Sequence, residues 1–108
     1  MDFLNKKCIP CEGGVSKIPL DKLQEYLGKI ENWHLIKNVT EIEKQFKFKN
    51  FVDAVSFVNR VADVAEKEGH HPDITIHYNR VTIELWTHSI GGLSQNDFIL
   101  ASCIEKLT

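Results

Sequence analysis

The chain has 108 residues, of which 43% are hydrophobic and 26% charged, a composition typical of one globular domain and not of a disordered chain. Thirteen basic against fifteen acidic residues give a net charge of -2, so no overall field attracts nucleic acid directly or an anionic membrane. No apolar run approaches the roughly 20 residues that span a bilayer, and there is no secretory signal pattern. Three cysteines are too few for a disulfide scaffold, which predicts a reducing, cytoplasmic location.

The N-terminal segment, residues 1–17, mixes Cys, Gly, Pro and Lys without a period and predicts an irregular arm. We therefore expect a single domain over residues 18–108. Its first element is a short helix after Pro19, where apolar residues recur at helical spacing until Gly28 stops the pattern.

Two strands and a long helix follow. Apolar and polar residues alternate over residues 33–37 and again over 42–48, which predicts two strands joined by a turn. The strongest helical pattern in the chain then runs from Phe51 to about Glu68, with apolar residues at i, i+3, i+4 and i+7. Asn50 can cap its first turn, and Gly69 ends it.

The last third of the chain predicts a hairpin and a helix. Alternation over residues 74–78 and 81–88 indicates two strands, with Asn79-Arg80 as the tight turn between them. Ser94 then has the position of an N-cap, with Asp97 three residues later as a capping-box partner.

The element order α-β-β-α-β-β-α predicts an α+β fold, a four-stranded antiparallel sheet with the helices packed on one face. The other sheet face must then be polar or covered. Trp86, His77 and Glu84 fall on that face, where they could line a cleft or contact a partner subunit.

Three of the five histidines are expected to meet at one end of the hairpin. His70 and His71 precede Pro72 between the long helix and the third strand, and His88 ends the fourth strand. A turn at Asn79-Arg80 would place His88 beside His71. Histidine is the side chain whose ordinary pKa lies nearest neutrality, so this cluster suits acid–base work. Glu66 lies one helical turn before His70, within reach of an imidazole.

Each of these residues also has a structural interpretation. A surface histidine is usually only solvated, and histidines at a helix end suit its dipole. Three imidazoles could also hold zinc, although adjacent histidines in an extended segment point in different directions. Cys8 and Cys11 have CxxC spacing without a second pair, which fits half a zinc site, a redox pair or two packed thiols.

The spacing of these residues closely resembles the signature of the pterin-4a-carbinolamine dehydratases. The resemblance covers roughly residues 20–108, and the family's order of elements agrees with the one predicted above. It also includes the segments 44–48 and 87–94. The residues that carry the signature are Glu66-x3-His70-His71-Pro72-x5-Tyr78-x9-His88-x8-Asp97.

The resemblance implies dehydration of 4a-hydroxytetrahydropterin to quinonoid dihydropterin, a product recycled to tetrahydrobiopterin after aromatic amino acid hydroxylation. It implies a pterin substrate and a site of His70, His71 and His88, with no metal and no bound cofactor. Loss of hydroxide needs one proton delivered to the leaving oxygen and another removed from a ring nitrogen. We expect His70 and His88 to do this in exchangeable roles, and His71 to position the pterin.

Three further residues are supporting candidates under the same resemblance. Glu66 would orient or tune one imidazole, as the family signature suggests. Trp33 could form a wall of the pterin cleft, because an aromatic face stacks on a planar heterocycle, with core packing as the alternative. Asp97 matches the signature, although its capping role could explain it fully.

Two other functions compete with the dehydratase. Animal members of the family also act as dimerisation cofactors of a transcription factor, so a protein-binding or coactivator module is the main alternative. The helix over residues 51–68 is apolar on more than one face, which favours self-association as a homodimer or homotetramer. A zinc protein that uses the histidines or Cys8 and Cys11 is the third possibility.

Overall fold

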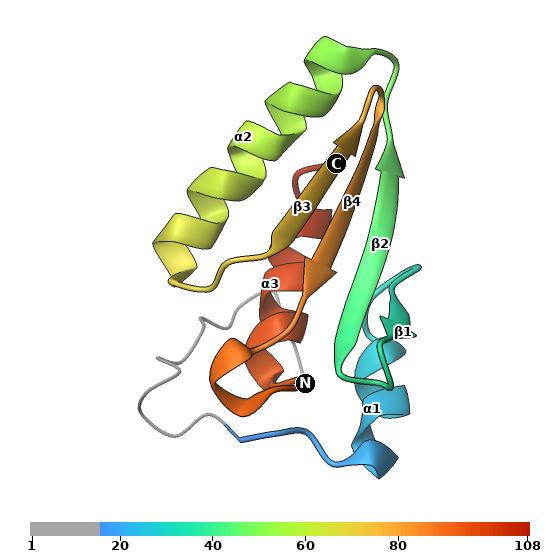
Figure 1. Cartoon of the computed structure of the whole chain (residues 1–108), viewed down its shortest axis with the longest axis vertical. Helices are drawn as coiled ribbons and strands as arrows, with labels where there is room; N and C mark the ends of the chain where they lie inside the picture. The colour runs from blue at the N-terminus through green and yellow to red at the C-terminus, as the bar shows by residue number, and fades with distance from the viewer. Residues whose placement is uncertain (1–15) are drawn as a thin grey trace.

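The computed structural model describes residues 16–108, so Cys8, Cys11 and most of the predicted arm over residues 1–17 lie outside the described residues. The predicted order α-β-β-α-β-β-α is confirmed (Figure 1). One 3-10 turn, His88–Ile90, is added before the last helix. The elements are α1 (Leu20–Leu27), β1 (His34–Ile36), β2 (Glu41–Lys47), α2 (Phe51–Glu68), β3 (Asp73–His77), β4 (Arg80–Leu85) and α3 (Gln95–Glu105).

The four strands form one antiparallel sheet in the order β1-β2-β4-β3, and α3 runs behind β3 and β4 (Figure 1). Along β4, Val81, Ile83 and Leu85 are fully buried, whereas the alternate residues face outward and are partly or fully exposed. This period of two shows that the helices cover one face and leave the other open, as expected from the sequence.

A single apolar core fills the space between the covered face and the helices. Phe57 of α2 lies at its centre, with its ring centroid 4.9 Å from that of Phe46 and 4.9 Å from that of Phe48. Burial of such a side chain is worth about 1.5–3 kcal/mol. The contact packs α2 against β2.

The predicted bounds of α2 are confirmed, and both ends have a clear cause. The Asn50 side chain accepts a hydrogen bond from the Asp53 backbone N–H at 2.8 Å, which caps the first turn. At the other end Gly69 adopts φ 66°, and the His70 backbone N–H returns to the Ala65 carbonyl at 3.2 Å. This closed helix end sets the position from which the His70 side chain projects.

The predicted hairpin register is wrong by two residues. The turn is Tyr78-Asn79, with His77 paired to Arg80 and Tyr78 at φ 53°. Asn79 is held at the tip because its side chain and carbonyl both bond the backbone of Phe48. A shift of two residues keeps every side chain on its own face, so alternation alone could not distinguish the two registers.

The prediction that His88 ends the fourth strand is also wrong. The strand stops at Leu85, and an isolated bridge between Thr87 and Gly92 closes a loop that contains the His88–Ile90 turn. The Thr87 N–H donates to the Gly92 carbonyl at 2.8 Å. The chain therefore folds back on itself at His88. None of the helices within residues 16–108 has the length and apolarity needed to cross a bilayer.

Candidate active site

The three predicted histidines line one cavity despite the changed register. The cavity has a volume of about 380 Å³, within the usual range for a small-molecule site. Its walls come from the segment that joins α2 to β3, from the first residue of β3, and from the 3-10 turn. The lining residues are Gly69, His70, His71, Pro72, Asp73, His88 and Ser89.

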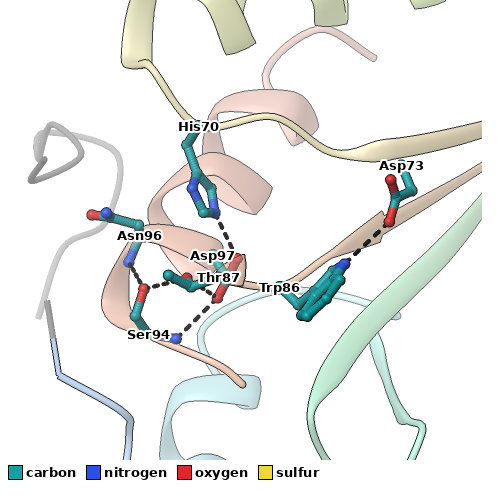
Figure 2. A network of polar contacts seen from close by, with 7 residues as sticks. All are labelled: His70, Asp73, Trp86, Thr87, Ser94, Asn96 and Asp97. Carbon is teal, nitrogen blue, oxygen red and sulfur yellow. Dashed lines mark hydrogen bonds and ion pairs between the residues drawn. The ribbon is translucent and has the colours of Figure 1, made fainter. Parts of the chain in front are cut away.

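His70 is buried and is held by an acidic partner from α3. Its Nε2 lies 2.7 Å from Oδ1 of Asp97, and the two side chains are 5% and 0% exposed (Figure 2). A hydrogen bond between two buried polar groups is costly to break, because either partner alone would be left unsatisfied. Asp97 therefore fixes the orientation of the His70 ring.

The other oxygen of Asp97 is occupied as well. Oδ2 accepts the Ser94 backbone N–H at 2.9 Å, which completes the predicted capping box, and the Thr87 hydroxyl at 2.9 Å (Figure 2). The Thr87 hydroxyl lies 2.7 Å from that of Ser94. A carboxylate can only accept hydrogen bonds, so with Asp97 in that form a neutral His70 ring donates from Nε2 to Oδ1, and Nδ1 is its acceptor nitrogen.

Glu66 contacts one of the three imidazoles, and it is His71 rather than the nearer-in-sequence His70. The sequence places it within reach of an imidazole without saying which; its Oε2 lies 2.5 Å from Nε2 of His71, and both side chains are largely exposed. The cause is the left-handed Gly69, which turns the chain so that His70 enters the interior while His71 remains over the helix end. Exposed ion pairs contribute little to stability, about 0–1 kcal/mol, so this contact orients His71 at most.

His88 has an aromatic neighbour in place of a carboxylate. Its ring stacks on the Trp86 indole, with the ring centroids 3.9 Å apart and 24° between the planes. The indole Nε1–H donates to Oδ2 of Asp73 at 3.1 Å (Figure 2). His88 itself is exposed. The site therefore combines one interior imidazole with two at the surface.

Trp33 does not join this group. It is 5% exposed, packs edge-on against Phe46 at 6.1 Å, and donates its Nε1–H to Glu105 at 3.1 Å. It is not among the residues that line the histidine cavity. The position corresponds to the core-packing alternative considered for it above.

Sequence reasoning missed Asp73 and Ser89 as lining residues and Thr87 as a partner of Asp97. Asp73 directly follows the His-His-Pro run, a signal that could have been used, whereas the Thr87 contact depends on the folded loop. For the zinc alternative, residues 16–108 contain no group of three His, Cys, Asp or Glu side chains arranged to hold a metal ion.

Comparison with known proteins places the chain among close relatives. The model of the family described as pterin 4 alpha carbinolamine dehydratase matches residues 16–107. A protein of Halorhodospira halophila assigned to the same dehydratase is 44% identical over 107 residues, covering 99% of this chain and 98% of its own.

Two solved structures share the fold. The transcriptional coactivator/pterin dehydratase of Brucella melitensis superposes with a TM-score of 0.81 at 32% identity, over 85% of this chain and 98% of its own. A pterin dehydratase-like protein identified as a RuBisCO assembly factor in the alpha-carboxysome superposes with a TM-score of 0.61 at 22% identity, over 71% and 89% of the two chains. At that identity the second structure supports the fold alone.

Proposed function

Because the chain belongs to the pterin-4a-carbinolamine dehydratase family, we propose that it is a hydro-lyase that converts 4a-hydroxytetrahydropterin to quinonoid dihydropterin and water. The observation that supports this most is the meeting of His70, His71 and His88 around one cavity of about 380 Å³. The role that we infer is recycling of the tetrahydropterin that an aromatic amino acid hydroxylase oxidises.

The reaction is a balanced loss of water. The bond from the 4a carbon to its hydroxyl oxygen breaks, and that oxygen leaves with a delivered proton. A ring nitrogen gives up its proton, and its electron pair forms the new double bond to the 4a carbon. One acid and one base are sufficient, and neither electrons nor a further reactant are needed.

His70 is our candidate for the base. With Nε2–H donating to Asp97, Nδ1 is left to accept the proton from the pterin ring. The imidazolium that forms is then stabilised by the same carboxylate, which is how a buried acidic partner assists a histidine base in other enzymes. Asp97 acts here as a positioning residue.

His88 is our candidate for the acid. It lines the cavity yet is exposed, so it can regain a proton from water after each turnover. His71 lines the same cavity and contacts Glu66, which suits binding and orientation of the pterin rather than proton transfer.

The test is a stopped-flow assay in which a hydroxylase generates the 4a-hydroxypterin and its disappearance is followed with and without the purified chain. We expect His70→Ala and His88→Ala each to lower kcat by about 10²- to 10⁴-fold, the usual contribution of a general acid or base. His34→Ala, which removes an exposed histidine of β1 outside the cavity, should leave the rate unchanged. Near-normal rates in both cavity variants would refute the assignment.

A protein-binding module is the second candidate, and the start of α2 favours it. Phe51 and Val52 are 51% and 73% exposed, and with Val55, Ser56 and Asn59 they line a shallow cavity of about 300 Å³. An apolar helix face of this kind suits a homodimer or homotetramer, or a protein partner. Light scattering on the wild type and on Val52→Glu tests it, because a monomer in both would exclude self-association through this face.

A further inference from the structure

The proton-transfer scheme uses His88 but gives no role to Trp86, the residue whose ring stacks on it. Thr87, which lies between them, is extended, with φ -102° and ψ 106°, so its neighbours project to the same side while its own hydroxyl turns inward to Asp97. The two rings lie nearly parallel at 3.9 Å. The extended backbone therefore points Thr87 to the buried hydrogen bonds of Asp97, and points Trp86 and His88 together to the opposite side.

The indole is itself anchored. Its Nε1–H donates to Oδ2 of Asp73, the first residue of β3, so Trp86, which directly follows β4, is tied to the neighbouring strand (Figure 2). Asp73 and His88 both line the histidine cavity, but Trp86 does not. Trp86 therefore does not line the cavity itself, but it contacts two residues that do, His88 through the stacked rings and Asp73 through the hydrogen bond.

His88 differs from the other two histidines of the cavity in what orients its ring. The ring of His70 is fixed by a buried hydrogen bond, and that of His71 contacts Glu66. The contact that defines the plane of the exposed His88 ring is the indole face. Flat stacking restricts rotation of the imidazole, and a proton donor must be held close to its working orientation to be effective.

We propose that Trp86, anchored by Asp73, is a positioning residue that holds the His88 ring in the orientation for proton delivery. This inference rests on the proposed dehydratase function and adds a specific residue to it. Loss of Trp86 could act in two ways, on the stability of the fold or on turnover, and the proposal predicts the second. A residue that only stabilised the fold would lower the amount of active protein, whereas a positioning residue lowers turnover in fully folded protein.

The experiment compares Trp86→Leu, which removes the flat ring, with Trp86→Phe, which keeps a ring but loses the bond to Asp73. Proton NMR of the histidine rings is the first measurement, with the His88 signals identified by their loss in His88→Ala. In the wild type the indole ring current should displace the His88 ring protons upfield. Trp86→Leu should abolish that displacement and leave the His34 signals in place.

The second measurement is the dehydratase assay on variants shown by thermal melting to be folded at the assay temperature. We expect Trp86→Leu to lower kcat about tenfold with KM changed by less than roughly twofold, and Trp86→Phe to recover most of the loss. Unchanged His88 signals in Trp86→Leu, or unchanged kcat once the stacking is lost, would overturn the positioning role alone. A wild-type chain without activity would overturn the proposed function and this role together.

Discussion

Two buried carboxylates in this small domain, Asp97 and Glu41, differ in how many hydrogen bonds they accept. Asp97, at the start of α3, is 0% exposed, and both its oxygens accept hydrogen bonds, from His70, Thr87 and the Ser94 backbone. Glu41, at the start of β2, is 5% exposed, and its Oε1 has no hydrogen-bond partner. Its Oε2 lies 3.6 Å from Nζ of an exposed lysine, Lys37.

The two carboxylates are both buried but differ in the hydrogen-bond donors around them. Burial is the main cause that raises the pKa of Glu41, and the nearby Glu84 carboxylate is the second, so the folded protein disfavours the charged form of Glu41. The hydrogen bond to Glu84 and the charge of Glu41 raise the pKa of Lys37 in turn. Asp97 instead accepts hydrogen bonds from three donors at the start of a helix, where the helix dipole favours a carboxylate, and one of those donors is the His70 imidazole. We infer that the number of hydrogen-bond donors, more than burial, distinguishes Asp97, the carboxylate that we propose positions His70, from Glu41.

The largest effect is expected from Asp97→Ala. The change leaves three donors short of an acceptor and removes the capping box, so we expect the free energy of unfolding to fall by about 3 kcal/mol in urea titration. Asp53→Ala is the matched control, because Asp53 has the same helix position in α2 but is exposed, and it should cost less than about 1 kcal/mol. Equal losses would show that the carboxylate acts only as a helix cap.

The next effect tests the partner of Asp97. His70→Ala should lower the free energy of unfolding by about 2 kcal/mol, because it removes a buried ring and leaves Oδ1 of Asp97 unpaired. His88→Ala, at the exposed side of the same cavity, should change it by less than about 1 kcal/mol. Urea titration at neutral pH measures both. Equal costs would contradict the division into one interior and one surface histidine.

A smaller effect is expected at the turn that delivers His70 to Asp97. Gly69 has φ 66°, so Gly69→Ala should cost about 1 kcal/mol through backbone strain alone, since no atom lies within 4 Å of the added methyl group. Gly28→Ala is the control, because Gly28 ends α1 with an ordinary φ of -65° and should change stability by less than about 0.5 kcal/mol. Thermal melts of the two variants compare them directly.

The smallest effect has the opposite sign. Because the pKa of Glu41 is raised in the folded state above its ordinary 4.5, the folded chain binds the proton more tightly, and stability falls as pH rises from about 4.5 through the folded pKa. Glu41→Gln should therefore stabilise the protein at pH 7 by up to about 1 kcal/mol, with no gain at pH 4. Glu43→Gln, on the same strand and face, is the control. A gain that persists at pH 4 would contradict the protonation account.

The parts of the fold that sequence reasoning predicted correctly are those with redundant local signals. The bounds of α2 followed from a long 3.6-residue period with Asn50 before it and Gly69 after it. The hairpin register was wrong because a shift of two residues preserves the alternation on which the prediction depended. The decisive contact, from Asn79 to Phe48, joins residues 31 apart and leaves no local trace.

For the candidate site, the sequence predicted which histidines lie together but not which residue each of them contacts. The grouping of the three histidines rests on chain order and on the resemblance, and the structure gathers them around one cavity. Their individual partners could not be assigned in advance, since Glu66 contacts His71 and Asp97 contacts His70 across 27 residues of sequence. Trp86 and His88, two residues apart, were the one pair whose contact the period of an extended segment could have suggested.

The link between His70 and Asp97 also has a consequence for how the chain acquires activity. The whole β3–β4 hairpin lies between these two residues, and Asp97 belongs to the first turn of the last helix. Long-range contacts of this kind form late, after loop closure has been completed. In a refolding time course, turnover should return with the final tertiary contacts, well after the circular dichroism signal of α2 has recovered.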